Sequence, residues 1–148
     1  MRDISSEDAA KRHGITTCHQ EMDNGELRFR LRKSDGSAYV RTESSPLGAW
    51  QNSHYHENIR ETYIVQKGWI AYAELIEGER VINVYEAGEL FTTKPHVIHN
   101  VYMPANAVIH TVKYGEASGE DRVESEATRE FDQVTQCLNE DQIRIEAG

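Results

Sequence analysis

Hydrophobic and polar residues alternate with a period of two over much of the chain between residues 15 and 114. Such alternation is typical of β-strands that have one buried face and one polar face. In 27–32, Leu27, Phe29 and Leu31 alternate with Arg28, Arg30 and Arg32, which predicts a half-buried strand with one basic face. That face could hold an anionic group, but charged strand faces are usually solvated. Further strands are expected at 38–42, 61–66, 69–75, 81–85, 90–93, 99–103 and 108–114.

Turn-forming residues separate these short segments. The triplets Asp23-Asn24-Gly25, Ser34-Asp35-Gly36 and Pro104-Ala105-Asn106 combine residue types that favour tight turns. Many short strands joined by turns, with little helix between them, predict an antiparallel all-β sandwich or barrel.

The two ends of the chain follow a different pattern. Ser5 or Ser6 is expected to cap a helix over 7–13 that Gly14 ends. After residue 115 we expect a polar linker at 116–126, an amphipathic helix at 128–138 and disorder at 141–148. The chain is therefore divided into a helix and lead-in strand (1–26), a barrel (27–115), and an acidic linker, helix and tail (116–148).

Charge and composition exclude several classes of protein. The net charge is −9, and 116–148 alone contain ten acidic residues against three arginines. Nucleic acid is not an expected partner, because its phosphate backbone requires a basic surface. Without an apolar run of about 18 residues or an apolar N-terminal segment, neither a membrane span nor a secretory signal is expected. Cys18 and Cys137 are widely separated, which fits reduced thiols in a cytoplasmic protein.

Three residues with metal-ligating side chains lie within eight positions of one another. His54 and His56 are two residues apart, so on an extended strand both imidazoles leave the same face. Two imidazoles at that spacing can bind one metal ion. Glu61 has the wrong parity to join them on an unbroken strand. The polar segment 57–60 must therefore turn or bulge the chain before a new strand begins at Glu61.

The spacing Gly48-x5-His54-x-His56-x4-Glu61-x6-Gly68 resembles the first signature motif of the cupin superfamily at every fixed position. The segment from Gly88 to His99 resembles the second motif in part, and its metal-binding histidine falls on His99. The expected proline is displaced to Pro95, and His96 stands where the family has glycine. His96 remains an alternative to His99, although its parity on a regular strand is opposite.

This resemblance implies a double-stranded β-helix, the jelly-roll barrel of cupins, and a metal held by His54, His56, Glu61 and His99. Three imidazoles and a carboxylate suit Fe(II), Mn(II), Ni(II), Co(II) or Zn(II). Resemblance to the family favours iron or manganese, and it also suggests a homodimer. On an octahedral ion four protein ligands leave two positions open, whereas on tetrahedral zinc they fill the coordination shell.

Three further residues are candidates for lining the same cavity. Tyr63 shares the inward parity of Glu61, Tyr102 lies three residues after His99, and His110 lies on an otherwise apolar strand face. If His110 faces the metal, it is the natural general base or acid, because its unperturbed pKa is closest to neutrality. The competing interpretation makes His110 and Tyr63 ordinary core residues.

The sequence therefore predicts a small metal-dependent cupin enzyme that acts on a polar small molecule. Two forms are considered: a sugar-like isomerase or epimerase, and an Fe(II)-type dioxygenase. One alternative is a non-catalytic module that binds or senses a small molecule. Another is a metal-free epimerase of nucleotide-linked sugars, in which histidine and tyrosine move the proton. The fold alone does not decide among them, because one barrel supports many chemistries.

Overall fold

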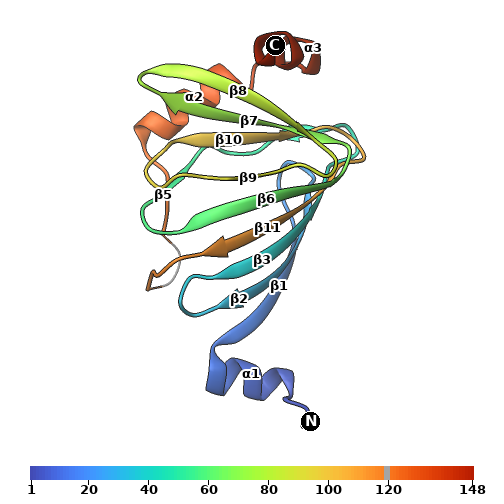
Figure 1. Cartoon of the computed structure of the whole chain (residues 1–148), viewed down its shortest axis with the longest axis vertical. Helices are drawn as coiled ribbons and strands as arrows, with labels where there is room; N and C mark the ends of the chain where they lie inside the picture. Colours follow the sequence, from blue (N-terminus) through green and yellow to red (C-terminus); the bar gives the residue numbers. More distant parts are fainter. Residues whose placement is uncertain (119–120) are drawn as a thin grey trace.

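The computed structural model describes residues 1–118 and 121–148, which form an antiparallel β-barrel with helices at both ends. In Figure 1 helix α1 and helix α3 lie at opposite ends of the long axis, with the strands stacked between them. The elements are α1 (Ser6–His13), β1 (Ile15–Glu21), β2 (Leu27–Lys33), β3 (Ala38–Glu43), β4 (Ala49–Trp50), β5 (Tyr55–His56), β6 (Arg60–Lys67), β7 (Trp69–Ile76), β8 (Glu79–Glu86), β9 (Leu90–Thr92), β10 (His99–Met103), β11 (Val108–Tyr114), β12 (Arg122–Val123), α2 (Glu126–Thr135) and α3 (Glu140–Ala147).

The strands form two principal sheets and one short pair. The larger sheet has the order β1-β2-β3-β11-β6-β9, and the smaller has the order β4-β10-β7-β8. Strand β12 pairs with β5, and an isolated bridge joins His54 to His99. Strands β1, β2 and β3 are joined as hairpins, as are β7 and β8, whereas the connections β6–β7, β8–β9, β9–β10 and β10–β11 cross between the two sheets. Repeated crossing between two facing sheets is typical of a jelly roll. The predicted all-β jelly-roll architecture with terminal helices is confirmed.

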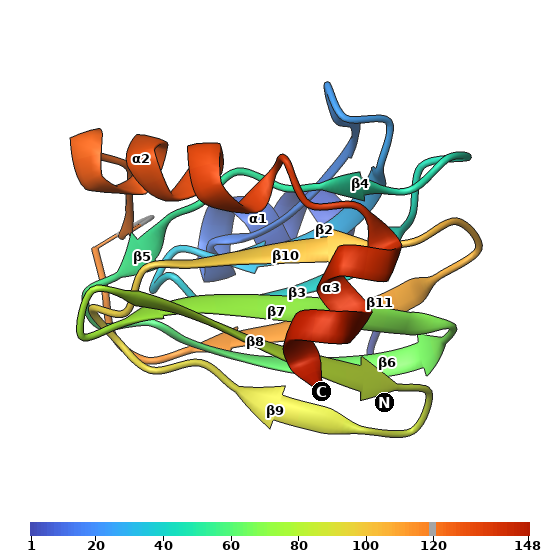
Figure 2. The ribbon, with the colours of Figure 1, turned by 90° about the horizontal axis from the view of Figure 1, so that it is seen from above.

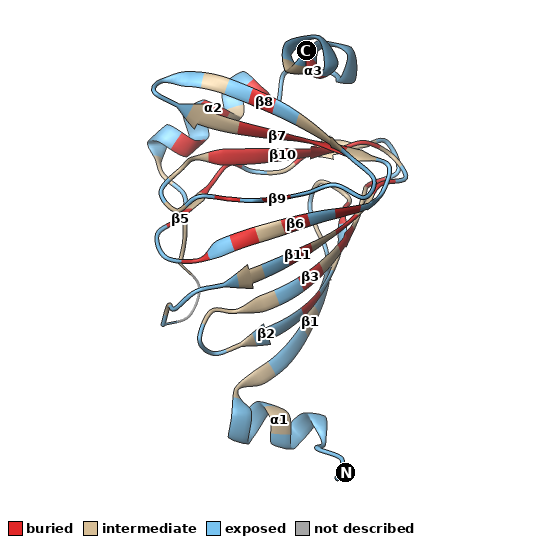
Figure 3. Cartoon of the chain, viewed as in Figure 1, coloured by how far each residue is buried: buried red, intermediate tan, exposed pale blue. Residues whose placement is uncertain are grey.

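Two apolar cores lie on opposite faces of the smaller sheet. The first fills the barrel between the two sheets and includes Tyr63, Ile70, Val101 and Ile109. The second packs Ala71, Ala73 and Tyr102 of the smaller sheet against helices α2 and α3. Figure 3 shows the resulting continuous buried stretches on β7 and β10. A strand buried on both faces therefore carries residues for the barrel interior at one parity and for the helices at the other.

Strand β2 has its faces reversed relative to the sequence prediction. Leu27, Phe29 and Leu31 are exposed, whereas Arg30 is only 8% exposed inside the barrel. The register places Arg30 beside Val40 of β3, which in turn pairs with Thr111 of β11. The interpretation of this basic face as solvated is therefore wrong for Arg30, whereas Arg32 is exposed. The larger sheet curls around a polar lumen, which accepts guanidinium groups in place of apolar side chains.

Several of the exposed apolar side chains lie together on the outer face of the larger sheet. An exposed apolar area of this kind often marks a contact with another protein. The homodimer expected from the sequence stays a prediction, and the molar mass in solution, measured by light scattering after gel filtration, would check it. The residues concerned are Leu27, Phe29, Leu31, Tyr39, Ile64, Leu90, Val112 and Tyr114.

The C-terminal residues form an ordered helix, which corrects the prediction of disorder over 141–148. Asn139 caps α3, and its side chain and that of Gln142 form a reciprocal capping box. The Tyr102 hydroxyl donates a hydrogen bond to Glu140 (2.7 Å), and the Arg144 guanidinium lies 4.1 Å from the centre of the Trp69 ring. Within the described ranges no helix is long and apolar enough to span a membrane.

Docking of α3 makes a testable contribution to stability. Ile143 is fully buried in the second core, whereas Ile145, two residues later, is 81% exposed. We expect Ile143→Ala to lower the free energy of unfolding by about 2–5 kcal/mol, because it removes buried methyl groups and leaves a cavity. Ile145→Ala is the matched control and should change it by less than about 0.5 kcal/mol. Equal urea midpoints for the two variants would contradict the docked helix.

Candidate metal centre

The four predicted ligands come from three chain segments that meet inside the barrel. The bridge between His54 and His99 consists of two backbone hydrogen bonds, in which each N–H donates to the other residue's carbonyl at 3.0–3.1 Å. His56 follows on β5, and the polar break after it allows β6 to begin anew. There the backbone N–H of Glu61 donates to Thr93 Oγ1 at 3.0 Å. The predicted break between His56 and Glu61 is therefore present, and it brings Glu61 to the histidine face.

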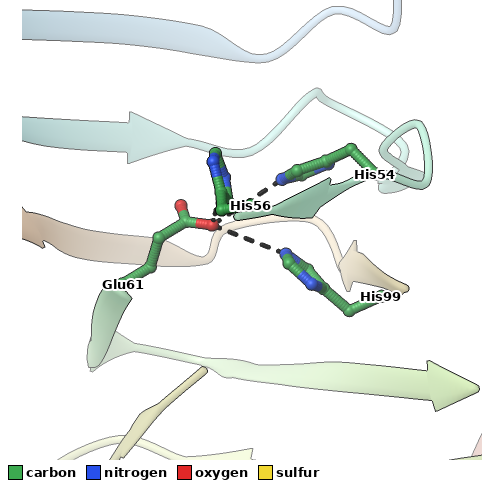
Figure 4. A group of neighbouring side chains, drawn as sticks. All are labelled: His54, His56, Glu61 and His99. Atoms are coloured by element: carbon green, nitrogen blue, oxygen red, sulfur yellow. Dashed lines mark ion pairs between the residues drawn. The ribbon is translucent and has the colours of Figure 1, made fainter. Parts of the chain in front are cut away.

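The ligand atoms converge on one carboxylate oxygen. Glu61 Oε1 lies 2.8 Å from His56 Nε2, 3.5 Å from His99 Nε2 and 3.7 Å from His54 Nε2. Figure 4 shows the three rings and the carboxylate pointing toward one another. All four ligand atoms lie within 4.8 Å of one another, and all four residues are buried. Ligands held about 2.1 Å from a common ion would be separated by about 3–4 Å, so the group fits a metal ion.

Each histidine is oriented through its other ring nitrogen. The Nδ1 atoms of His54 and His99 lie 3.0 Å from the backbone carbonyls of Asn52 and Val97, respectively. His56 Nδ1 lies 2.8 Å from Asp121 Oδ1. Because a carbonyl oxygen can only accept, Nδ1 must carry the proton in His54 and His99. Their Nε2 lone pairs are then left facing the centre, as metal ligands require.

The centre contains polar atoms that the surrounding protein leaves unsatisfied. Among the described residues, His56 Nε2, His99 Nε2 and Glu61 Oε1 are buried without a hydrogen-bond partner. Burying such atoms without a partner is costly. A cation at their common focus would satisfy three acceptors at once. The donor set and its unpaired atoms therefore form a metal-binding group.

The electrostatics of the group keep its members ready to bind a cation. Burial alone would raise the pKa of Glu61, but the three histidine rings close to its carboxylate and the charge of Lys113 hold it well below its usual value. Burial lowers the pKa of His54 to about 4, and the nearby carboxylate of Glu61 opposes this effect only in part. Burial also lowers the pKa of His56, but Glu61 and Asp121 outweigh it and raise that pKa above 6.5. His54 is therefore neutral near pH 7, whereas a metal must compete with a proton for His56.

Of the further residues predicted to line the cavity, Tyr63 faces the metal-binding group and His110 does not. Tyr63 faces the centre, and its hydroxyl donates a hydrogen bond to Glu61 Oε2 at 3.2 Å. His110 lies on the outer face of its sheet, where its ring nitrogens contact Tyr39 and Gln66. This orientation follows from strand alternation, because the flanking residues Ile109 and Thr111 are the buried ones. A catalytic role for His110 at this centre is therefore not compatible with its position.

Tyr102 and His96 also lie away from the centre. Tyr102 has the opposite parity to His99 on β10 and packs between Trp50 and Trp69 toward the C-terminal helices. Its predicted place in the cavity is therefore wrong. His96 is exposed, and its backbone is left-handed with φ of 67°. Glycine adopts this conformation most easily, which is why the cupin motif has glycine at this position. His99, not His96, joins the other three ligands.

Asp121 is the contact that sequence reasoning missed. It lies in the segment interpreted as a linker, yet its second carboxylate oxygen accepts hydrogen bonds from the backbone N–H groups of Asn58 and Ile59 at 2.7 and 2.9 Å. It thus ties the turn after His56 to the short strand β12. An acid in an acidic, Gly-containing stretch carries no periodic signal, so only the three-dimensional contact identifies it.

A small cavity opens beside the metal-binding group. Its volume is about 130 Å³, and His54, Glu61 and Tyr63 line it together with Arg28, Arg30 and Lys113. This is smaller than the 300–1,000 Å³ typical of sites for drug-sized ligands. The space suits a molecule of few non-hydrogen atoms.

Comparisons with known proteins rest on structure rather than sequence. No protein-family model and no curated protein match the chain. Among solved structures, an oxalate decarboxylase of Bacillus subtilis described for its Mn(II) centres is similar, with a TM-score of 0.57, 19% identity, and coverage of 68% of this chain and 28% of that one. The oxalate decarboxylase of Lactobacillus farciminis gives a TM-score of 0.56, 18% identity, and coverage of 68% and 30%.

A CENP-C cupin domain of Drosophila melanogaster is also similar, with a TM-score of 0.54, 12% identity, and coverage of 76% of this chain and 85% of that one. The aligned part spans less than a third of the oxalate decarboxylase chains but most of the CENP-C domain. At these identities the likeness establishes the fold and not the activity. Together with the converging His54, His56, Glu61 and His99, it identifies this chain as a protein of cupin fold with a metal-binding group inside its barrel.

Proposed function

We propose that the protein is a metal-dependent enzyme that acts on a polar small molecule. The observation that carries this proposal is the buried set of unpaired ligand atoms beside a cavity of about 130 Å³. A structural ion would need no such adjoining space. Four protein ligands on a six-coordinate ion also leave room for a substrate to approach.

When bound, a divalent ion would act as a Lewis acid and acidify a C–H bond next to a substrate carbonyl, or, if it is Fe(II), support chemistry with dioxygen. The chain supplies the proton-carrying groups. Tyr63 donates to Glu61 Oε2, and the Lys113 ammonium lies 3.9 Å from the same oxygen. Burial and the charge of Glu61 raise the pKa of Tyr63 well above its usual value, so its hydroxyl stays protonated and donates to Glu61. These two residues replace His110 as the candidates for moving or holding a proton.

Iron or manganese is the proposed metal. The similarity to an oxalate decarboxylase described with Mn(II) centres supports manganese, although it concerns that protein. Elemental analysis of protein purified without chelators should find about one equivalent of either ion. Turnover without oxygen would then favour the isomerase or epimerase form over the dioxygenase form. Stoichiometric zinc without activity would contradict the proposal.

A non-catalytic role is the second candidate. It is favoured by the similarity to a CENP-C cupin domain, which is also described bound to CAL1. This alternative predicts tight ligand or protein binding and no product over hours. The metal-free epimerase is less well supported, because among the candidates His110, Tyr63 and Tyr102 only Tyr63 lines the cavity, and no candidate histidine does so outside the ligand set.

Removing one histidine tests the ligand set. We expect His56→Ala to lose most of its bound metal, because one of four ligands and the shortest contact with Glu61 disappear. The barrel should stay folded, since β5 has only two residues. Elemental analysis and circular dichroism measure the two outcomes. His110→Gln is the matched control on the outer face and should keep both metal and turnover. Unchanged metal content in His56→Ala would contradict the assignment.

Asp121 tests the support behind the ligands. Asp121→Asn keeps the shape of the side chain but removes a carboxylate that, together with Glu61, makes His56 more basic. We expect metal affinity to fall by about 10–100-fold, as is usual when a carboxylate partner of a ligating histidine is lost. Glu124→Gln, three residues further along, pairs only with Arg122 among the described residues and serves as the control. Titration with Mn(II) under identical conditions would measure both, and equal affinities would argue against this role.

The raised pKa of His56 predicts how metal binding depends on pH. In the metal-free protein His56 binds its proton more tightly than a free histidine does, so a metal must displace that proton. Affinity should therefore fall as the pH drops through this pKa, above 6.5, by about tenfold per pH unit. Calorimetry at pH 5.5–8.5 would detect both the change and the released proton. A constant affinity across this range would be inconsistent with the shift.

A further inference from the structure

Two cavities meet at the metal-binding group, and both are lined by cations. The smaller one contains Arg28, Arg30, Lys113 and Arg122, and the second, of about 370 Å³, contains Arg30, Arg32, Lys33 and Lys113. His54 and Glu61 line the first cavity, while His56 and Asp121 line the second. Arg30 and Lys113 belong to both. They therefore mark the place where the two spaces adjoin the candidate metal centre.

This concentration of positive charge is opposite in sign to the net charge of the chain. The protein has a net charge of −9, yet six of its 16 lysines and arginines line these two cavities. The acidic residues that line them are Asp23, Glu61 and Asp121, and two of these already engage the histidines. A divalent ion on Glu61 would add further positive charge. The lining of these two cavities is thus electropositive within an acidic protein.

Arg30 is the clearest sign of a missing partner. It is the only lysine or arginine in the described part of the chain that is buried. Its guanidinium donates to neutral acceptors, Gln20 Oε1 at 2.8 Å and Met22 Sδ at 3.7 Å, and no carboxylate among the described residues forms an ion pair with it. Burial lowers the pKa of Arg30, and the neighbouring charges of Arg28 and Arg32 add to this effect. A buried guanidinium held among other cations is destabilising unless an anion compensates it.

We propose that the cavity binds a small organic carboxylate, which Arg30 and its neighbouring cations hold at one end while its other polar group faces the four metal ligands. This inference deepens the proposed function by naming the substrate class. The planar fork of arginine matches a carboxylate with two parallel hydrogen bonds. Arg28 is already paired with the fully buried Glu26 at 2.8 Å, so Arg30 is the buried guanidinium that has no carboxylate partner among the described residues.

The register shows that one molecule could reach both ends. Arg30 pairs with Val40, Val40 with Thr111, and Thr111 with Tyr63, which lies two residues after Glu61. Three strand spacings separate Arg30 from Tyr63 along the sheet, about 14 Å between backbones. Both arginine and glutamate side chains extend into the lumen across this interval. A ligand of a few non-hydrogen atoms, with a carboxylate at one end, spans the remainder.

Calorimetric titration of the metal-loaded and metal-free full chain provides the test, with malonate, its neutral analogue malonamide, and inorganic phosphate as probes. Malonate should bind at least tenfold more tightly than malonamide. Arg30→Gln should weaken malonate binding by about 10–100-fold, the usual range for a charge-assisted pair. Arg41→Gln is the matched control, because Arg41 lies on the adjacent strand but pairs with Glu43 on the outer face. It should leave malonate binding unchanged.

A second variant guards against a folding defect. If Arg30→Gln is not folded by circular dichroism, Lys113→Met supplies the reading, since Lys113 lines both cavities and should also lose at least tenfold. Equal binding of malonate and malonamide, or unchanged affinity in a folded variant, would overturn the proposal. Tighter binding of phosphate would contradict the carboxylate assignment. Arg30-dependent malonate binding by protein that takes up no metal would instead overturn the proposed function and leave this inference standing.

Discussion

The meeting of three imidazoles on one buried carboxylate oxygen is the constraint on which the centre depends. Glu61 Oε1 lies 2.8–3.7 Å from three Nε2 atoms in a region that water barely reaches. Lone pairs aimed at one another in a low dielectric repel, so the arrangement is favourable only when a proton or a cation lies between them. The fold maintains it by fixing each ring from behind, through two backbone carbonyls and the carboxylate of Asp121. The contacts that fix the three rings thus also determine the metal-binding chemistry at Glu61.

The two sheets of the barrel contribute differently to the surroundings of this centre. The smaller sheet is apolar on both faces and is covered by α2 and α3, as seen from above in Figure 2. It carries His99 on strand β10. The larger sheet is apolar near Tyr63 and Ile109 but becomes cationic toward β2. Packing therefore dominates on one side of the ligands, and charge dominates on the other.

Spacing in the sequence was sufficient to predict the ligands, because His54, His56 and Glu61 are close along the chain and His99 lies at a motif position. Predictions that depended on long-range geometry did less well. Tyr102 and His110 have the parity opposite to their inward-facing neighbours, and parity cannot be assigned until a strand's register is known. Strand β2 shows the same difficulty, since alternation identifies two faces but not which one is enclosed. The order of α3 was missed although its Asn139–Gln142 capping box is present in the sequence.

The reversal of β2 also explains why this barrel would select charged molecules. Apolar residues at 27, 29 and 31 would have filled the lumen if they had pointed inward, and the strand would then have contributed only to the core. With the register observed, the inner positions hold Arg28 and Arg30, and the apolar side chains face outward at a cost in exposed surface. A protein tolerates exposed apolar side chains on one face of a strand when the polar residues on the other face have a function. An electropositive lumen next to unsatisfied metal ligands is a setting in which a small anion would be held, oriented and polarised together.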